Sequence, residues 1–197
     1  MADALLISNI LLWVLVVVLA LVVLALTRQI GVLHERVAPA GALMLAGGPK
    51  VGEQAPVLEA TDLDGGSVAI GGANDAGLSS LLFFLSPTCP VCKSLLPVLQ
   101  SSRKAEQSWL RVILASDGEI SAQRAFVADS GLGEFRYVVS TALGLAYQVS
   151  KLPYAVLIDD QGILRAKGLV NSREHLESLF AAKETGFASV QEYLSRS

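Results

Sequence analysis

The sequence predicts an α/β sandwich with a mixed central sheet, preceded by one N-terminal transmembrane helix. A long uncharged apolar run from Ala4 to Leu26 has the length of a membrane span. Two shorter apolar runs, Ser80–Ser86 and Trp109–Ser116, lack polar alternation, as strands buried on both faces do. The segment Tyr154–Val170 contains two strand-like runs around the turn Asp159–Gly162, which is a hairpin signal. Parallel strands combined with a hairpin make the sheet mixed.

The composition indicates one folded domain with an apolar appendage. A chain of 197 residues and 20.7 kDa can bury a sizeable core but is short for two ordinary domains. The hydrophobic fraction of 52% and the mean hydropathy of +0.53 are high, and the excess lies at the N-terminus. The net charge of -3 and the absence of any basic run give no support for a nucleic-acid partner.

The N-terminal run is predicted to be a membrane anchor, residues 1–28, with the span at about 4–26. As a helix the run would measure about 35 Å, enough to cross a hydrocarbon core of about 30 Å. A cleaved signal peptide is the alternative. Against it, Asp3 stands where such peptides carry a basic residue, and the run is longer than their apolar region. Membrane lipid is therefore an expected partner of this segment.

The charges beside the span bear on its orientation. Arg28 and Arg36 follow the span, whereas Asp3 and the α-amino group precede it, so the positive-inside rule alone places the folded domain in the cytosol. Residues 29–50 mix charges with Ala, Gly and Pro and are predicted to form a juxtamembrane linker. The folded domain is predicted to cover residues 51–197.

Two helices are expected to alternate with the strands in the first half of this domain. The first runs from Val91 to about Lys104, between the two buried strands, and forms a strand, helix, strand unit with them. The second, Glu119–Gly131, ends at a glycine. Its buried side is expected to comprise Ile120, Ala125, Phe126 and Val127.

The second half adds a strand and two helices. The strand is expected at Phe135–Ser140, and an amphipathic helix at Asn171–Glu184 follows the hairpin. Asn171 or Ser172 is its expected N-cap. The residues expected to face inward are Leu176, Leu179 and Phe180. A last helix, Phe187–Ser195, is expected to pack at the surface.

The chain has two cysteines, Cys89 and Cys92, which lie in the stretch SPTCPVCKSLLPVL between the first buried strand and the first helix. A zinc site needs about four ligands, and this pair supplies two. The histidines, His34 and His175, are better explained as solvated side chains, so no metal site is expected. A structural disulfide between cysteines so close in sequence would restrict the unfolded chain little.

A thiol–disulfide redox centre fits the pair better. Cys89 is expected at the N-terminus of a helix, where unpaired amides and the helix dipole stabilise a thiolate. Cys92 lies one turn further on and can reach a sulfur attached to Cys89. Pro90 suits the first helical turn, because its missing N–H costs nothing there. The expected redox group is the disulfide itself, with no other cofactor.

These residues resemble the thioredoxin superfamily. Lys93 directly follows the second cysteine, and Pro97 stands where thioredoxins carry a helix-kinking proline. The stretch KLPYAVLID resembles the segment that holds their cis-proline, which implies that Leu152 and Pro153 dock the backbone of a substrate chain. The fold implied is a thioredoxin-like three-layer sandwich. The stretch Val51–Ile70 is similar to the TlpA and peroxiredoxin branch, where a short hairpin precedes the first central strand.

The chain departs from the thioredoxin pattern at two places. Phe83 occupies the position, six residues before the first cysteine, at which thioredoxins keep a buried carboxylate. The dipeptide Pro90–Val91 lacks the histidine of the strongly oxidising DsbA proteins. The motif therefore leaves the direction of electron flow open. Tyr154, beside the proline, is better explained as a half-buried strand residue than as a docking residue.

Nearly the whole chain resembles the MauD family of methylamine utilisation proteins, most specifically in its tail, SREHLESLFAAKETGFASVQEYL. The resemblance implies a membrane-anchored thiol–disulfide oxidoreductase or isomerase that assists maturation and stability of the methylamine dehydrogenase small subunit. That client is rich in disulfides, which persist in the periplasm. A single-pass inner-membrane protein with a periplasmic C-terminal domain is thus expected, against the charge rule. A further redox partner would recycle the disulfide.

Three other functions share some of these features. A TlpA-like thiol reductase for cytochrome c maturation shares every motif, and the reduction potential would separate it from an oxidase. A non-catalytic, membrane-tethered chaperone for the dehydrogenase subunit is the alternative from another class. A peroxiredoxin fits poorly, because Pro87 and Thr88 directly precede Cys89, whereas its pattern needs a threonine three residues before the reactive cysteine.

Overall fold

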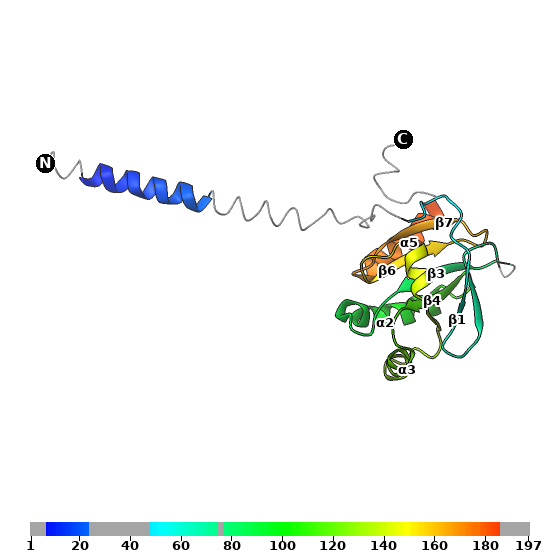
Figure 1. The fold of residues 1–197 in the computed structure, drawn as a ribbon. Coiled ribbons are helices and arrows are strands. Elements are labelled where there is room, and N and C mark those ends of the chain that lie inside the picture. The colour runs from blue at the N-terminus through cyan, green and yellow to red at the C-terminus, as the bar shows by residue number, and fades with distance from the viewer. Residues whose placement is uncertain (1–6, 24–47, 75–76, 186–197) are drawn as a thin grey trace. The chain divides into compact units, whose positions relative to one another are not determined.

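The computed structural model describes residues 7–23, 48–74 and 77–185, with side chains up to residue 183. The chain divides into two compact units, Met1–Ala40 and Gly41–Ser197. In the first unit, residues 7–23 form a helix whose side chains are exposed all round (Figure 1). No helix within the described ranges is long and apolar enough to cross a membrane. Both ends of the predicted span, residues 4–6 and 24–26, lie outside those ranges, as do most of the predicted linker and the predicted helix Phe187–Ser195.

The second unit is built on a five-stranded mixed sheet in the order β5, β4, β3, β6, β7, most of which can be followed in Figure 1. The strands are β5 (Arg136–Val139), β4 (Leu110–Ser116), β3 (Ser79–Phe84), β6 (Tyr154–Ile158) and β7 (Leu164–Leu169). β3, β4 and β5 run parallel, whereas β6 is antiparallel to both β3 and β7. The mixed sheet predicted from the sequence is confirmed.

The other elements surround this sheet. A two-stranded hairpin of β1 (Leu58–Thr61) and β2 (Ser67–Ile70) precedes β3, as the resemblance to the TlpA and peroxiredoxin branch implies. The helices of this unit are α2 (Pro90–Ala105), α3 (Ile120–Asp129), α4 (Thr141–Ala146) and α5 (Arg173–Thr185).

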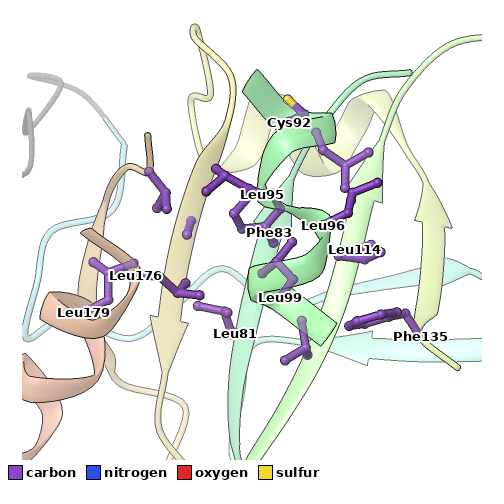
Figure 2. Close-up of a cluster of buried hydrophobic side chains, with 14 of the residues drawn as sticks. Leu81, Phe83, Cys92, Leu95, Leu96, Leu99, Leu114, Phe135, Leu176 and Leu179 are labelled. Carbon is purple, nitrogen blue, oxygen red and sulfur yellow. The ribbon is translucent and has the colours of Figure 1, made fainter. Parts of the chain in front are cut away.

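One face of the sheet is covered by α2 and α5. Leu81 and Phe83 of β3 are fully buried on this face. Figure 2 shows α2 lying across them, with Leu95, Leu96 and Leu99 pointing toward the sheet and Leu176 and Leu179 reaching in from α5. These helical residues recur at the three- and four-residue spacing of an amphipathic helix, so burial of one stripe fixes each helix on the sheet.

The opposite face is covered by α4 and the hairpin. The alternate β3 residues, Leu82 and Phe84, pack here with Leu143 of α4 and with Val68 and Ile70 of β2. All six residues of β3 are buried because both faces of the strand are covered, which explains its continuous apolar run. The outcome is a three-layer sandwich.

The termini of α2 and α5 agree with the sequence. Cys89 is the N-cap of α2 and Pro90 its first residue. Ser172 caps α5, since its Oγ accepts a hydrogen bond of 3.4 Å from the backbone N–H of His175.

Two expectations about the helices were wrong. In α3, Ile120 is 55% exposed and Ala125 is also exposed, whereas Gln123 is buried beside Phe126. Gln123 tolerates burial because its Oε1 accepts a 2.6 Å hydrogen bond from the Tyr137 hydroxyl and its Nε2 donates to the Asp117 carbonyl. The second error is α4, a short helix that the sequence pattern did not reveal.

Candidate redox site

The site lies in the loop between the end of β3 and the start of α2. Cys89 and Cys92 are joined by a disulfide, with 5.2 Å between their Cα atoms. The Cys89 Sγ also accepts a hydrogen bond of 3.2 Å from the backbone N–H of Cys92. This amide lies in the first turn of the helix, where no helical carbonyl is available to accept from it. The loop before it is ordered by Ser86, whose carbonyl accepts from the Cys89 N–H at 3.1 Å. The first cysteine is therefore held at the N-terminus of α2, the positive end of the helix dipole.

The two sulfurs differ in access to solvent. Cys89 is partly exposed, whereas Cys92 has 0% exposure and lies in the core cluster beneath α2. Pro90 and Val91 between them are exposed, and Val91 is 42% accessible. A thiol from another protein can approach the Cys89 sulfur, and the protein itself shields the Cys92 sulfur.

Leu152 and Pro153 lie at the same edge of the sheet as the disulfide. Phe84, at the end of β3, pairs with Tyr154, at the start of β6, so the residues before Tyr154 are neighbours of the loop that leads to Cys89. The Leu152–Pro153 peptide bond is cis, as the thioredoxin resemblance implies. Leu152 is 38% exposed, and no described residue forms a hydrogen bond with its backbone N–H or C=O. A docking role for the two residues stays a prediction.

The remaining motif residues fall on the exposed side of α2. Lys93 is exposed, and its backbone N–H donates to the Cys89 carbonyl at 3.2 Å. Pro97 lies inside α2 and is exposed. Because a proline has no N–H, it leaves the carbonyl of Lys93 without its usual helical partner. Neither side chain faces the core, so both are features of the helix rather than parts of the buried site.

No carboxylate lies beneath the disulfide in the described part of the chain. Phe83 is fully buried and belongs to the same apolar cluster as Cys92. The carboxylates buried within the described residues are Asp62 and Asp159. Asp159 follows the far end of β6, and Asp62 is bound to Arg136 at the outer strand β5, whose hydrogen bond lowers the pKa of that carboxyl. The buried carboxylates of the described residues thus belong to other parts of the fold.

Of three other residues considered from the sequence, the structure describes two, Tyr154 and His175. Tyr154 is 1% exposed and packs against the ring of Phe84, and burial raises the pKa of its hydroxyl. It is a core residue, more buried than expected. The Nδ1 of His175 accepts a hydrogen bond of 3.3 Å from the backbone N–H of Asn171, next to the start of α5. His34 lies outside the described residues. No metal-binding group of three or more His, Cys, Asp or Glu side chains occurs in the described ranges.

The sequence reasoning missed one part of this edge. Gly144 and Leu145 of α4 line a pocket that Leu152 also lines. Because α4 itself was not predicted, nothing in the pattern connected these residues with the segment before the cis-proline. The one available signal was Ser140, whose side chain caps α4 by accepting from the Leu143 N–H at 3.2 Å.

Two solved structures with a similar fold are named as thiol–disulfide proteins. A putative thiol:disulfide interchange protein DsbE from Chlorobium tepidum superposes with a TM-score of 0.60 at 19% identity, covering 68% of this chain and 96% of that one. The thioredoxin domain of a thiol-disulfide oxidoreductase from Bacteroides vulgatus gives a TM-score of 0.59 at 19% identity, with 68% and 97% covered. At this identity the likeness establishes the fold, which is thioredoxin-like.

Sequence relatives are much closer. A scan against protein-family models finds no match. The methylamine utilization protein MauD of Paracoccus denitrificans is 49% identical over 195 residues, which cover 99% of this chain and 96% of the relative. MauD of Methylorubrum extorquens is 46% identical over 188 residues, covering 95% and 91%. With this identity along nearly its full length, the chain belongs to the MauD family.

Proposed function

We propose that this protein is a membrane-anchored thiol–disulfide oxidoreductase of the periplasm that assists disulfide formation in, and stability of, the methylamine dehydrogenase small subunit. The observation that carries the proposal is the Cys89–Cys92 disulfide, with its first sulfur accessible at the start of α2 and its second buried. The client is inferred from membership of a family whose relatives are named for methylamine utilization.

The oxidising reaction proceeds in two exchanges. A client thiolate attacks the Cys89 sulfur, the Cys89–Cys92 bond breaks, and Cys92 leaves as a thiolate. A second client thiolate then attacks the client sulfur of the mixed disulfide, which closes the client disulfide and releases Cys89 as a thiolate. The client gives up two electrons and two protons in total, and the cysteine pair takes up the two electrons. A separate redox partner must then reoxidise the pair.

The N-terminus of α2 favours this chemistry at Cys89. The N–H of Cys92 donates to the Cys89 sulfur, and the helix dipole adds positive potential there, so a thiolate at Cys89 is stabilised when it leaves. The backbone of Leu152, without a partner in the described chain, can pair with an extended client segment next to the mixed disulfide. Leu152 and Pro153 thus act in docking the client.

The anchor is proposed from the N-terminal apolar run. Ala4–Leu26 contains no charged residue, and its described part, residues 7–23, is helical with apolar side chains exposed on every side. A helix that is apolar all round needs an apolar environment. The folded domain is placed in the periplasm because a disulfide-forming client is assembled where disulfides persist.

Trapping the client tests the function. In the Cys92→Ser variant the Cys89 thiolate can attack a client disulfide, which is the reverse of the second exchange, and no Cys92 remains to displace the client from the mixed disulfide. The variant purified from its native host is therefore expected to carry the dehydrogenase small subunit in covalent, dithiothreitol-sensitive linkage. The Cys89→Ser/Cys92→Ser double variant is the matched control and should carry nothing. The absence of any adduct on Cys92→Ser would refute the exchange mechanism, and full client maturation by the double variant would favour a chaperone.

The reduction potential of the Cys89–Cys92 couple tests the direction of electron flow. An oxidase or isomerase requires a value of about −180 mV or above, because it must accept electrons from client thiols. A value of about −270 mV would instead support a TlpA-like reductase. Equilibration of the purified full chain with glutathione buffers, followed by alkylation and mass spectrometry, gives the potential.

A further inference from the structure

A polar pocket lies between the β1–β2 hairpin and the sheet. Its volume is about 310 Å³, and it is lined by residues 67–69 of β2, residues 111–113 of β4 and Arg136 of β5. Arg111 and Arg136 stand at or next to the starts of β4 and β5, whereas the disulfide follows the C-terminal end of the parallel strand β3. This arginine pocket therefore lies toward the opposite end of the sheet from the candidate redox site.

Arg111 brings to this pocket a positive charge that no acidic group balances. The side chain is half-buried, its Nε donates to the Ser80 hydroxyl at 2.7 Å, and its Nη2 donates to the Ala69 carbonyl at 3.4 Å. Both acceptors are neutral, and no carboxylate of the described residues forms an ion pair with Arg111. Burial lowers the pKa of its guanidinium. A half-buried cation of this kind is stabilised when an anion replaces the water that it has lost.

Arg136 supplies a second guanidinium from the neighbouring strand. It pairs with Ile113 of β4, and Arg111 lies two residues before Ile113, so both arginines project from the same face of the sheet. The Arg136 Nη1 donates to Asp62 at 2.6 Å, whereas no described residue accepts from its Nε or Nη2. The side chain is 66% exposed, which leaves these donors accessible. Asp62 balances the charge of Arg136, and the pocket keeps the charge of Arg111.

We propose that the arginine pocket binds a phosphate group. Guanidinium donors from two adjacent strands, with the exposed Ser67 hydroxyl beside them, approach the pocket from more than one direction. A tetrahedral phosphate has oxygens on all sides to accept from them, whereas a carboxylate has two oxygens in one plane and is matched by a single guanidinium. Free phosphate and the headgroup of an anionic phospholipid both present this chemistry. The site is separate from the disulfide, so the proposal goes beyond the proposed function and does not depend on it.

Side-chain NMR of the arginines measures this binding directly. The full chain is labelled with a heavy nitrogen isotope and purified in a non-ionic detergent, and the Nε–H signals of the arginines are followed while sodium phosphate replaces sodium chloride at constant ionic strength. The Arg111→Lys variant identifies the Arg111 signal. In the wild type this signal is expected to shift with phosphate until it saturates, because an oxyanion in the pocket changes the hydrogen bonds of the guanidinium. Sodium acetate is titrated in the same way and should bind more weakly.

A carboxylate placed in the pocket supplies the decisive variant. Ser67 lines the pocket and is exposed, so Ser67→Asp should fold and set a negative charge beside the two arginines. Its phosphate affinity is expected to fall at least about tenfold, which is about 1.4 kcal/mol of binding free energy. Ser178→Asp is the matched control, because it makes the same change at an exposed serine of α5 that does not line the pocket. The control should bind phosphate as the wild type does.

Lipid nanodiscs distinguish the two sources of phosphate. If a headgroup fills the pocket, the Arg111 signal is already shifted in discs that contain phosphatidylglycerol and responds no further to added phosphate. If free phosphate is the ligand, the titration is the same in these discs and in discs of phosphatidylcholine alone. Either result supports the proposal, provided that Ser67→Asp loses the shift.

Three results would overturn the proposal. The first is a shift that fails to saturate or that chloride reproduces, which is a general salt effect. The second is acetate binding as tight as phosphate binding. The third is equal phosphate affinity in the wild type and Ser67→Asp. Phosphate should leave the reduction of the Cys89–Cys92 disulfide by dithiothreitol unchanged, since the pocket and the disulfide lie toward opposite ends of the sheet.

Discussion

Cys89 and Cys92 are three residues apart but lie in different environments. The first is partly exposed at the helix N-terminus, and the second has 0% exposure. After reduction, Cys89 is expected to react with iodoacetamide at least about tenfold faster than Cys92, because reactivity follows thiolate character and access. Brief labelling followed by peptide mass spectrometry gives both rates. Equal rates in the folded protein would contradict the division of roles, and guanidinium chloride should equalise them.

Asp159 shows how a buried charge is used for structure rather than chemistry. Its Oδ1 accepts from the backbone N–H groups of Gln161 at 2.9 Å and Ile163 at 2.8 Å, and its Oδ2 accepts from Arg165 at 2.6 Å. Asp159→Ala leaves these donors unpaired at the β6–β7 turn and is expected to cost about 3 kcal/mol of unfolding free energy. Asp160→Ala, at the neighbouring position, should cost less than about 0.5 kcal/mol. Urea unfolding followed by circular dichroism compares them, and similar losses would contradict the assignment.

At the scale of elements, the hairpin is fastened to the sheet through Asp62. Its Oδ2 accepts from Arg136 of β5 at 2.6 Å, and its Oδ1 accepts from the Gly66 N–H at 2.7 Å. The Arg136 hydrogen bond, followed by that of Gly66, lowers the pKa of Asp62 in the folded protein. A carboxyl whose pKa is lower in the folded than in the unfolded state stabilises the fold above its ordinary value of about 3.9. That stability is lost as the pH falls through this value to the lower folded pKa.

The prediction for Asp62 concerns the acid side of the stability curve. Asp62→Asn removes the titrating group, so the unfolding free energy of the variant should fall less steeply than that of the wild type as the pH drops below about 4. Urea unfolding midpoints, measured from about pH 3 to about pH 6, give the pH dependence of stability for both proteins. Asp64→Asn, at an exposed neighbour, should follow the wild type. Identical profiles for wild type and Asp62→Asn would show that the pair does not couple stability to pH.

The elements that could be predicted from the sequence are those whose buried residues form a continuous apolar run or recur at helical spacing. β3 and β4 were found because strands covered on both faces need continuous apolar runs, and α2 because its buried leucines recur at helical spacing. α3 was placed correctly but its buried side was not, since the pattern could not reveal that Tyr137 would satisfy a buried Gln123. α4 was missed because it buries one residue, Leu143, and exposes the next apolar one, Leu145.

The same distinction holds for the site. Cys89 and Cys92 could be identified because their chemistry depends on local spacing and on a helix N-terminus, and both are visible in the sequence. The neighbourhood of Leu152 depends on the pairing of Phe84 with Tyr154, residues that are far apart along the chain. The pocket beside Leu152 is also lined by residues of α4, which the sequence did not predict. Long-range pairing leaves no periodic signal in a single sequence, so only the resemblance to thioredoxins pointed to Leu152 and Pro153.

At the scale of the whole molecule, parallel and antiparallel pairing collects the site at one edge of the sheet. β3, β4 and β5 are parallel, so their C-terminal ends lie together, and the start of the antiparallel strand β6 joins them. The disulfide, Leu152 and the pocket beside Leu152 all follow or precede these strand ends. Loops at such an edge can change without disturbing the core, which would suit the proposed exchange with a specific client.

Two physical rules disagree on the orientation of the proposed membrane anchor. Arg28 and Arg36 favour retention of the C-terminal side in the cytosol, but they are few and Glu35 lies between them. The Cys89–Cys92 couple, if it oxidises a client, needs an oxidising compartment, because cytosolic thiol buffers keep such pairs reduced. We therefore predict a cytosolic N-terminus and a periplasmic C-terminus. Alkaline phosphatase, which folds only where its disulfides form, should be active when fused after Ser197 of the full chain. Activity of β-galactosidase fused at the same place would show a cytosolic C-terminus, which would contradict both the predicted orientation and the oxidising role.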